Sequence, residues 1–159
     1  MHLELTNSVQ RATIDDCDAA RVSGMSWRLH SRGYVVSSVR GGGMIYLHRL
    51  LTGATSGVQV DHIDHDRLNN RRANLRLASA AQNNRNSAIS RRNRTGFKGV
   101  SRKGGRGPFR AFIGDDGRRI FLGSFPDAAS AARAYDQAAV AIYGDFASPN
   151  GAPVVSGVR

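Results

Sequence analysis

Residues 58–86 read VQVDHIDHDRLNNRRANLRLASAAQNNRN, a segment dense in His, Asp, Asn and Arg. Its first residues, 58–60, predict a strand that continues into Asp61 and His62. Leu75–Leu77 predicts the return strand. Three polar residues between the two strands favour turn conformations: Asp66, Asn69 and Asn70.

A helix is expected after the second strand. Ser79 and Gln82 have the spacing of a capping box, so a helix should begin here and carry Asn83 and Asn86. Further upstream, residues 47–51 predict a short helix that ends at Gly53. The rest of residues 1–57 predicts short strands and turns, to which we assign no chemistry. The clearest are Tyr34–Val39, the turn Gly41–Gly43, and Met44–Tyr46.

The C-terminal part has its own organisation. Three short strands are expected there, over Phe97–Val100, Phe109–Ile113 and Arg118–Leu122. Residues 114–117 (GDDG) predict a hairpin turn between the last two strands. Pro126 and Asp127 should open a helix that ends before Gly144, with a stripe of alanines that allows close packing on a sheet.

These patterns predict an α+β chain of two small domains. We expect residues 1–86 to form one domain with a β-rich N-terminal extension, residues 87–95 a basic linker, residues 96–150 the second domain and residues 151–159 a tail. The second domain should be a three-stranded antiparallel sheet packed on one helix.

Composition narrows the classes of partner. The chain has 159 residues, with 23 Lys and Arg against 12 Asp and Glu, which gives a net charge of +11. A chain with this excess of positive charge is expected to bind a polyanion. The charge is uneven, because residues 1–84 hold 10 basic and 7 acidic side chains, whereas residues 85–159 hold 13 and 5. No apolar run has the length of a membrane span, so no membrane partner is expected. The single Cys17 excludes an intramolecular disulfide.

Asp61 and His62 suggest phosphodiester chemistry. A neutral imidazole can take a proton from an attacking water near pH 7, and a hard divalent cation held by carboxylate and amide oxygens can neutralise phosphate charge. Neighbouring strand residues point to opposite sides, so a twist, bulge or strand end is needed for both to reach one phosphate. His65 lies three residues after His62, but two histidines without a third ligand are a weak sign of zinc.

The segment from His48 to Asn86 resembles the HNH endonuclease motif of phage and intron-encoded homing endonucleases. The resemblance rests on Asp61-His62, Asn74, Asn83 and the framing residues, and it implies a ββα-metal fold. By resemblance, His62 is the general base, Asn74 holds the hairpin loop, and Asp61 and Asn83 bind a divalent ion, expected to be Mg²⁺. Three arginines of this part are expected to meet DNA phosphates: Arg49, Arg71 and Arg76.

Residues 96–150 resemble an AP2/ERF DNA-binding domain, whose sheet lies in the major groove. The resemblance rests on spaced blocks, among them Phe109–Ile113 and Phe121–Phe125, and Lys98, Ser101 and Phe109 depart from the plant pattern. The residues expected to contact DNA in this part and the linker are Arg91, Arg92, Arg94, Lys98, Arg102, Lys103, Arg110, Arg118 and Arg119.

The sequence therefore predicts a metal-dependent endonuclease acting on double-stranded DNA, with its target set by the C-terminal module. By resemblance, it would come from a phage and work in the cytoplasm of a bacterial host. Monomeric nicking and double-strand cutting by a homodimer both stay open. Two rivals are a non-catalytic DNA-binding regulator on a degenerate HNH scaffold and an RNA-binding or general polyanion-binding protein. The A-form major groove is too narrow for side chains, which argues against RNA.

Overall fold

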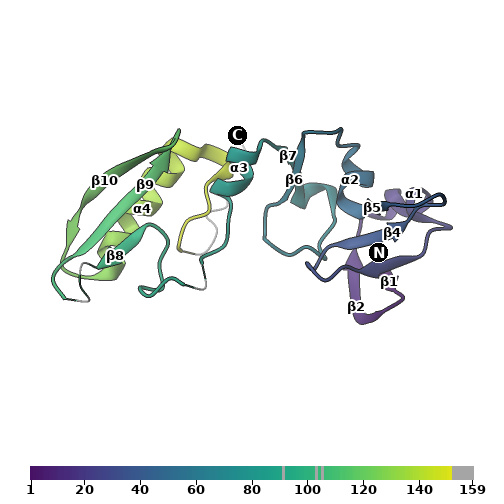
Figure 1. Ribbon diagram of the computed structural model, residues 1–159, viewed down its shortest axis with the longest axis horizontal. Coiled ribbons are helices and arrows are strands. Elements are labelled where there is room, and N and C mark those ends of the chain that lie inside the picture. Colours follow the sequence, from purple (N-terminus) through teal and green to yellow (C-terminus); the bar gives the residue numbers. More distant parts are fainter. Residues whose placement is uncertain (91, 103, 105, 152–159) are drawn as a thin grey trace. The chain divides into compact units, whose positions relative to one another are not determined.

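The computed structural model describes residues 1–90, 92–102, 104 and 106–151. It is a mixed α+β chain built from several small antiparallel sheets. The chain divides into two compact units, one over residues 1–84 and a second that begins at Arg85. Figure 1 shows the elements of each unit. Among the described residues, no helix has the length and apolar character needed to cross a bilayer.

The N-terminal part of unit 1 consists of short strands, as the sequence predicts. A hairpin of β1 (His2–Leu5) and β2 (Ser8–Thr13) precedes the short helix α1 (Ala19–Val22). A three-stranded meander follows, made of β3 (Trp27–Leu29), β4 (Val35–Ser38) and β5 (Met44–Tyr46). Their apolar side chains form one core with residues of the next elements, including Ile14, Trp27, Val35, Leu47, Leu51, Val60 and Leu75.

The segment 58–86 forms strand, loop, strand and helix in the predicted order. Strand β6 (Gln59–His62) pairs antiparallel with β7 (Leu75–Ala78), and α3 (Ala80–Arg85) follows. The predicted capping box is confirmed, because the N–H of Gln82 donates to Ser79 Oγ and the N–H of Ser79 donates to Gln82 Oε1. The prediction that α3 carries Asn86 is wrong, since the helix ends at Arg85.

Helix α2 (Leu47–Thr52) lies immediately upstream, and Gly53 ends it as predicted. Leu47 and Leu51 are buried in the core of unit 1, one helical turn apart, which fixes α2 against the β6–β7 hairpin. His48 follows Leu47, and this packing therefore sets its position.

Unit 2 contains one sheet and one long helix. The antiparallel sheet has the order β8 (Val100–Arg102), β9 (Phe109–Asp115), β10 (Arg118–Phe125). Asp116 and Gly117 join β9 to β10, and both have positive φ, as a two-residue primed turn requires. Helix α4 (Ala128–Tyr143) begins at the predicted cap, where Asp127 accepts from the N–H of Ser130.

The first strand of this sheet lies later than predicted. We expected it over Phe97–Val100, but it begins at Val100. Gly96 and Gly99 both have positive φ, which interrupts an extended backbone. At Gly99 a Cβ atom would collide with the ring of Tyr135 and the carbonyl oxygen of Phe112, so the close approach of α4 requires glycine here.

Candidate active site

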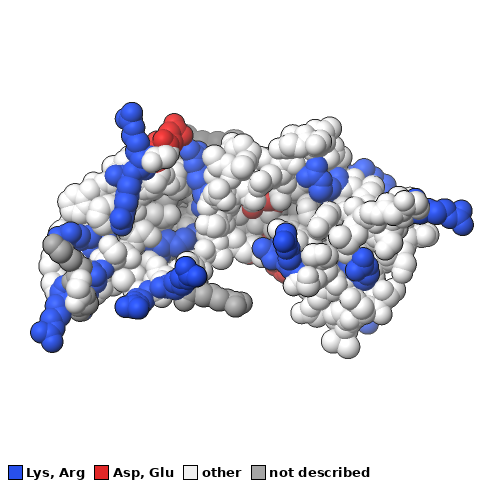
Figure 2. Space-filling view, in the orientation of Figure 1, with Lys and Arg blue, Asp and Glu red and all other residues white. Residues whose placement is uncertain are grey.

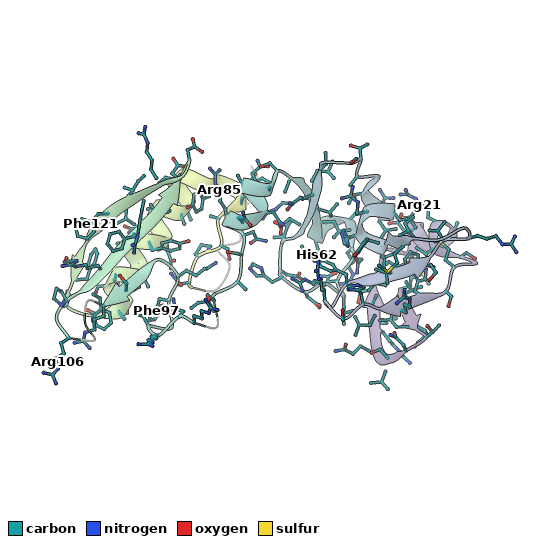
Figure 3. The ribbon with its side chains drawn as sticks, in the orientation of Figure 1. Arg21, His62, Arg85, Phe97, Arg106 and Phe121 are labelled. Atoms are coloured by element: carbon teal, nitrogen blue, oxygen red, sulfur yellow. The ribbon has the colours of Figure 1, made fainter. Side chains whose placement is uncertain are left out.

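His62 is the last residue of β6 and is only 5% exposed. It lies inside unit 1 among side chains from several elements (Figure 3). Asp61, the preceding residue, points to the other side of the strand, as alternation requires. The contacts agree with this, because Asp61 binds Arg76 whereas His62 contacts Asn70 and two aromatic rings. His62 ends the strand, which is one of the three arrangements that the pair requires, and in these contacts Asp61 and His62 have different partners.

The surroundings of His62 favour a neutral imidazole. Its Nε2 lies 3.4 Å from Oδ1 of Asn70, and its ring centroid lies 5.3 Å from that of His48 and 6.1 Å from that of Tyr34. Burial is the largest cause that lowers the pKa of His62 below 6.5, and Arg67 adds to it; the Asn70 hydrogen bond and the nearby carboxylates oppose it. The net direction is downward, so His62 is able to accept a proton at neutral pH.

Asn70 and Tyr34 contact His62, and the sequence analysis did not single them out as site residues. Asn70 is fully buried, and its Nδ2 donates to the carbonyl oxygen of Arg67 while its backbone N–H donates to that of Thr13. The pair Asn69-Asn70 predicted only a turn. Tyr34 immediately precedes β4 of another sheet, and no sequence spacing connects it with His62.

His48 completes a cluster of rings around His62. Its ring centroid lies 5.1 Å from that of Tyr34 and 5.5 Å from that of Tyr46. Its buried Nδ1 has no hydrogen-bond partner within the described part of the chain. Burial, followed by His62, Arg49 and Arg67, lowers the pKa of His48 to about 3. His48 is therefore a neutral, closely packed neighbour of His62.

Asn74 holds the loop that follows His62. Its Nδ2 donates to Oδ1 of Asp64 and to the carbonyl oxygen of Asn69, both at 2.8 Å, and its Oδ1 accepts from the N–H of Asp64 at 3.0 Å. Burial alone would raise the pKa of Asp64. Hydrogen bonds lower the pKa and outweigh burial; they come from Asn69, from the N–H of Asp66 and from Asn74. Asn74 thus ties both ends of the loop to an ionised carboxylate.

Asp61 and Asn83 belong to one side of β6. Asn83 Nδ2 donates to Gln59 Oε1 at 2.6 Å, and Gln59 lies two residues before Asp61, on the same face of the strand. Oδ2 of Asp61 accepts from Nε and Nη2 of Arg76, its partner on β7, at 2.8 and 2.7 Å. This carboxylate is therefore already paired with a cation.

The donor set fits a hard divalent cation that keeps part of its water. One carboxylate and one amide oxygen are ligands that Mg²⁺ accepts, because it is usually bound by one or two carboxylates together with water and phosphate oxygens. Among the described residues, no group of three or more His, Cys, Asp or Glu side chains is placed to hold a metal. That Asp61 and Asn83 hold such an ion stays a prediction.

The chain is similar to known proteins over this segment. The HNH endonuclease family matches residues 46–85, which contain α2, β6, β7 and α3. The chain is also 35% identical over 135 residues to a protein of Acanthamoeba polyphaga mimivirus named as an uncharacterized HNH endonuclease. That match covers 81% of this chain and 68% of the viral protein. The chain belongs to the HNH endonuclease family. HNH enzymes are nucleases that act on DNA and generally use a divalent metal ion.

The viral match extends beyond the HNH segment. Unit 1 has only 84 residues, so an alignment of this length necessarily includes part of unit 2. The family match itself ends at residue 85 and gives no support to an AP2/ERF domain in unit 2.

The arginines expected to meet DNA in the HNH unit differ in their surroundings. Arg49 donates to the carbonyl oxygens of Val58, Ala54 and Thr55, so it closes the loop between α2 and β6. Arg76 pairs with Asp61, whereas Arg71 is exposed. Arg67, which we had not singled out, lies 4.4 Å from the centre of the Tyr34 ring. Contact of Arg49, Arg71 and Arg76 with phosphate stays a prediction.

The register of unit 2 separates its basic residues into two sets. Ala111 and Ile113 are buried in the clusters with α4, so the alternate residues Arg110, Phe112 and Gly114 face away from that helix. Ser101 pairs with Arg110, Arg119 with Gly114, and Phe121 with Phe112. We call these six residues the outer face of the sheet. Figure 2 shows further Lys and Arg side chains over the visible side of this unit.

The other basic residues of unit 2 lie elsewhere. The Nε of Arg102 donates to Gly107 and its guanidinium lies 4.8 Å from the Phe109 ring, while Arg118 is paired in register with Asp115. Lys98 Nζ donates to the carbonyl oxygen of Ser87 and to Ser148 Oγ, and burial lowers its pKa. The two linker arginines that the structure describes, Arg92 and Arg94, are exposed. Arg91 and Lys103 lie outside the described residues.

Proposed function

We propose that this HNH protein is a metal-dependent endonuclease that hydrolyses phosphodiester bonds of double-stranded DNA. The observation that carries the proposal is the position of His62. Its imidazole has a lowered pKa and lies at the end of β6. The preceding residue is Asp61, and Asn83 lies on the same face of the strand as Asp61. The expected base and the expected metal ligands belong to opposite sides of β6, and the end of that strand at His62 is where both sides can reach one phosphate. The match of residues 46–85 to the HNH endonuclease family supports this proposal.

The chemistry follows from the hydrogen bonds of His62. When Nε2–H donates to Asn70 Oδ1, the lone pair lies on Nδ1, which makes Nδ1 the proton acceptor. A water that loses its proton to Nδ1 forms a new O–P bond as the bond to the 3′ oxygen breaks, which leaves a 5′ phosphate and, after protonation, a 3′ hydroxyl. Asn74 positions the loop after His62, and Asp61 and Asn83 would hold the divalent ion. When bound, the ion supplies neutralisation of charge on the phosphate and the leaving oxygen.

A second function is favoured by one contact. Arg76 donates twice to Asp61 in a buried ion pair, an arrangement that also serves to hold two strands together. If that pair persists when DNA is bound, Asp61 is a structural residue and the protein is a non-catalytic DNA-binding regulator on an HNH scaffold. The two functions differ at the metal site and share every DNA contact.

We further propose that unit 2 is an AP2/ERF-like module that sets the target. Residues 85–159 contribute +8 of the net charge of +11, and the outer face of the sheet presents Arg110 and Arg119 away from α4. A basic sheet of this kind can enter the major groove, where Arg bonds two acceptors of guanine. One HNH site addresses one phosphate, so cutting both strands requires a second copy or a rearrangement.

The test is a cleavage assay on supercoiled plasmid with added Mg²⁺, which separates nicked from linear products. His62→Ala should abolish cleavage and leave DNA affinity near that of the wild type, since the imidazole takes the proton but carries no phosphate charge. His2→Ala is the matched control, because His2 is an exposed histidine in β1 of the same unit. Equal loss of cleavage and binding in His62→Ala would contradict the assignment of the base. Wild-type binding without cleavage in any divalent metal would favour the regulator.

A further inference from the structure

The outer face of the sheet in unit 2 carries two phenylalanines that the core does not use. Phe121 of β10 is 55% exposed and pairs in register with Phe112 of β9. Their ring centroids lie 5.3 Å apart with an interplanar angle of 48°. Figure 3 labels Phe121 on β10. Apolar side chains on the other face, such as Ala111 and Ile113, are buried under α4, so the core does not account for Phe121.

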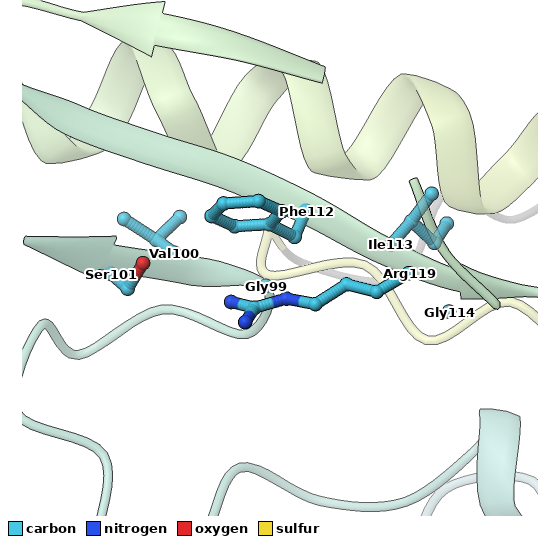
Figure 4. Close-up of a pocket in the computed structure, with 7 residues that line it drawn as sticks. All are labelled: Gly99, Val100, Ser101, Phe112, Ile113, Gly114 and Arg119. Carbon is cyan, nitrogen blue, oxygen red and sulfur yellow. The ribbon is translucent and has the colours of Figure 1, made fainter. Parts of the chain in front are cut away.

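This aromatic pair is surrounded by basic and polar groups rather than by a larger apolar surface. The guanidinium carbon of Arg119 lies 3.8 Å from the centre of the Phe112 ring. Arg110 and Ser101 belong to the same face. A shallow hollow of about 390 Å³ opens beside Phe112, and Figure 4 shows the Arg119 side chain running along it towards Gly99 and Ser101. The charge suits a polyanion, and the apolar rings require an apolar group on that partner.

We infer that Phe121, supported by Phe112, contacts the 5-methyl group of thymine in the major groove. The groove edges of the base pairs present hydrogen-bond donors and acceptors, and the thymine methyl is the one apolar group among them. A phosphate contact would not use a phenyl ring. Intercalation would require the ring to enter between stacked bases, whereas Phe121 is packed against Phe112 across the strands. The inference rests on the proposed function, in particular on the sheet meeting duplex DNA.

Phe112 and Arg119 have supporting roles in this contact. Phe112 limits the rotation of the Phe121 ring by contact across the sheet, and its ring also lies under the guanidinium of Arg119, which restricts the position of that side chain. The face therefore offers an apolar contact beside a fixed two-donor group. Such a surface selects thymine at one position by its methyl group rather than by a hydrogen bond.

The experiment compares thymine with uracil, which lacks only the methyl group. The full chain, in buffer with EDTA, selects from a pool of random 40-base-pair duplexes amplified with dTTP, and sequencing identifies the enriched motif. That motif is then synthesised with thymine or uracil at each T position. We expect uracil at one position to weaken wild-type binding by about fourfold, the effect of burying one methyl group.

Variants locate the preference in Phe121. Phe121→Ala should bind the thymine and uracil forms equally, and Phe121→Leu should keep part of the preference because it remains apolar. Val140→Ala is the matched control, since Val140 is 50% exposed on α4 and should retain the full preference. Circular dichroism of each variant checks that unit 2 is folded. A preference that persists in Phe121→Ala overturns the inference.

Failure of the inference is distinguishable from failure of the proposed function. If the wild-type chain enriches no motif, unit 2 does not select a target, and the proposed targeting role of unit 2 fails together with the inference; plasmid cleavage tests the endonuclease separately. If it enriches a motif but binds every uracil form as tightly as the thymine form, only the thymine contact fails. Tighter binding to the single strands of the motif than to the duplex would show that the phenyl rings stack on unpaired bases, which also overturns the inference.

Discussion

Buried His48 should make the stability of unit 1 depend on pH, and replacing it by Phe should remove the His48 contribution to that dependence. The pKa of His48 in the folded chain is lowered from 6.5 to about 3. Between these values the unfolded chain binds a proton that the folded chain does not, so the free energy of unfolding falls as the pH falls below 6.5. At pH 5 the expected loss is about 2 kcal/mol, and it reaches about 4 kcal/mol near pH 3.

The measurement uses urea unfolding followed by tryptophan fluorescence. Trp27 is the one tryptophan of the chain, and it is 2% exposed in the core of unit 1, so its emission reports this unit. The free energy of unfolding of His48→Phe minus that of the wild type should rise by about 2 kcal/mol between pH 7 and pH 5. This change does not depend on how far the two proteins differ in stability at pH 7. Carboxylates titrate in both proteins and cancel in the comparison.

The control is His2→Phe, which replaces an exposed histidine of the same unit and should follow the wild type at both pH values. Parallel pH dependence of His48→Phe and the wild type would refute the reasoning. It would mean that His48 is protonated in the folded chain and that its Nδ1 finds a partner.

Other changes test the loop, the metal and the sheet. Asn74→Ala removes three hydrogen bonds and should cost about 3 kcal/mol in the same urea assay, with slower cleavage; unchanged stability would contradict its role in the loop. Removing divalent ions with EDTA should stop plasmid cleavage, and full activity in EDTA would eliminate the metal mechanism. Arg119→Ala should weaken duplex binding, and if Arg119 contacts a phosphate, the slope of log Kd against log salt should fall by about 1. Arg102→Ala should change neither the affinity nor the slope, because Arg102 donates to Gly107. Equal effects of the two substitutions would contradict the assignment of Arg119 to the outer face and Arg102 away from it.

Much of the local structure was predictable because short-range interactions specify it. The capping box at Ser79 and Gln82, the helix end at Gly53 and the turn at Asp116-Gly117 each depend on residues within four positions of one another. The two strands of the hairpin were also predicted, over residues 58–62 and 75–77, and each lies within one residue of that prediction, at Gln59–His62 and Leu75–Ala78. The first strand of unit 2 was predicted too early, because the need for glycine at position 99 arises from Tyr135 on a distant helix.

The spacing of Asp61, His62, Asn74 and Asn83 was sufficient to recognise the HNH segment, because residue type and order along one hairpin and helix carry that information. Their partners depend on packing between elements far apart in the chain. Cross-strand register brings Arg76 to Asp61, and the meander brings Tyr34 to His62. Register also turns Arg110 and Arg119 to the outer face and Arg102 away from it, a separation that charge counts do not contain. Local sequence therefore predicted which groups are present, and long-range packing set which of them are neutral, paired or exposed.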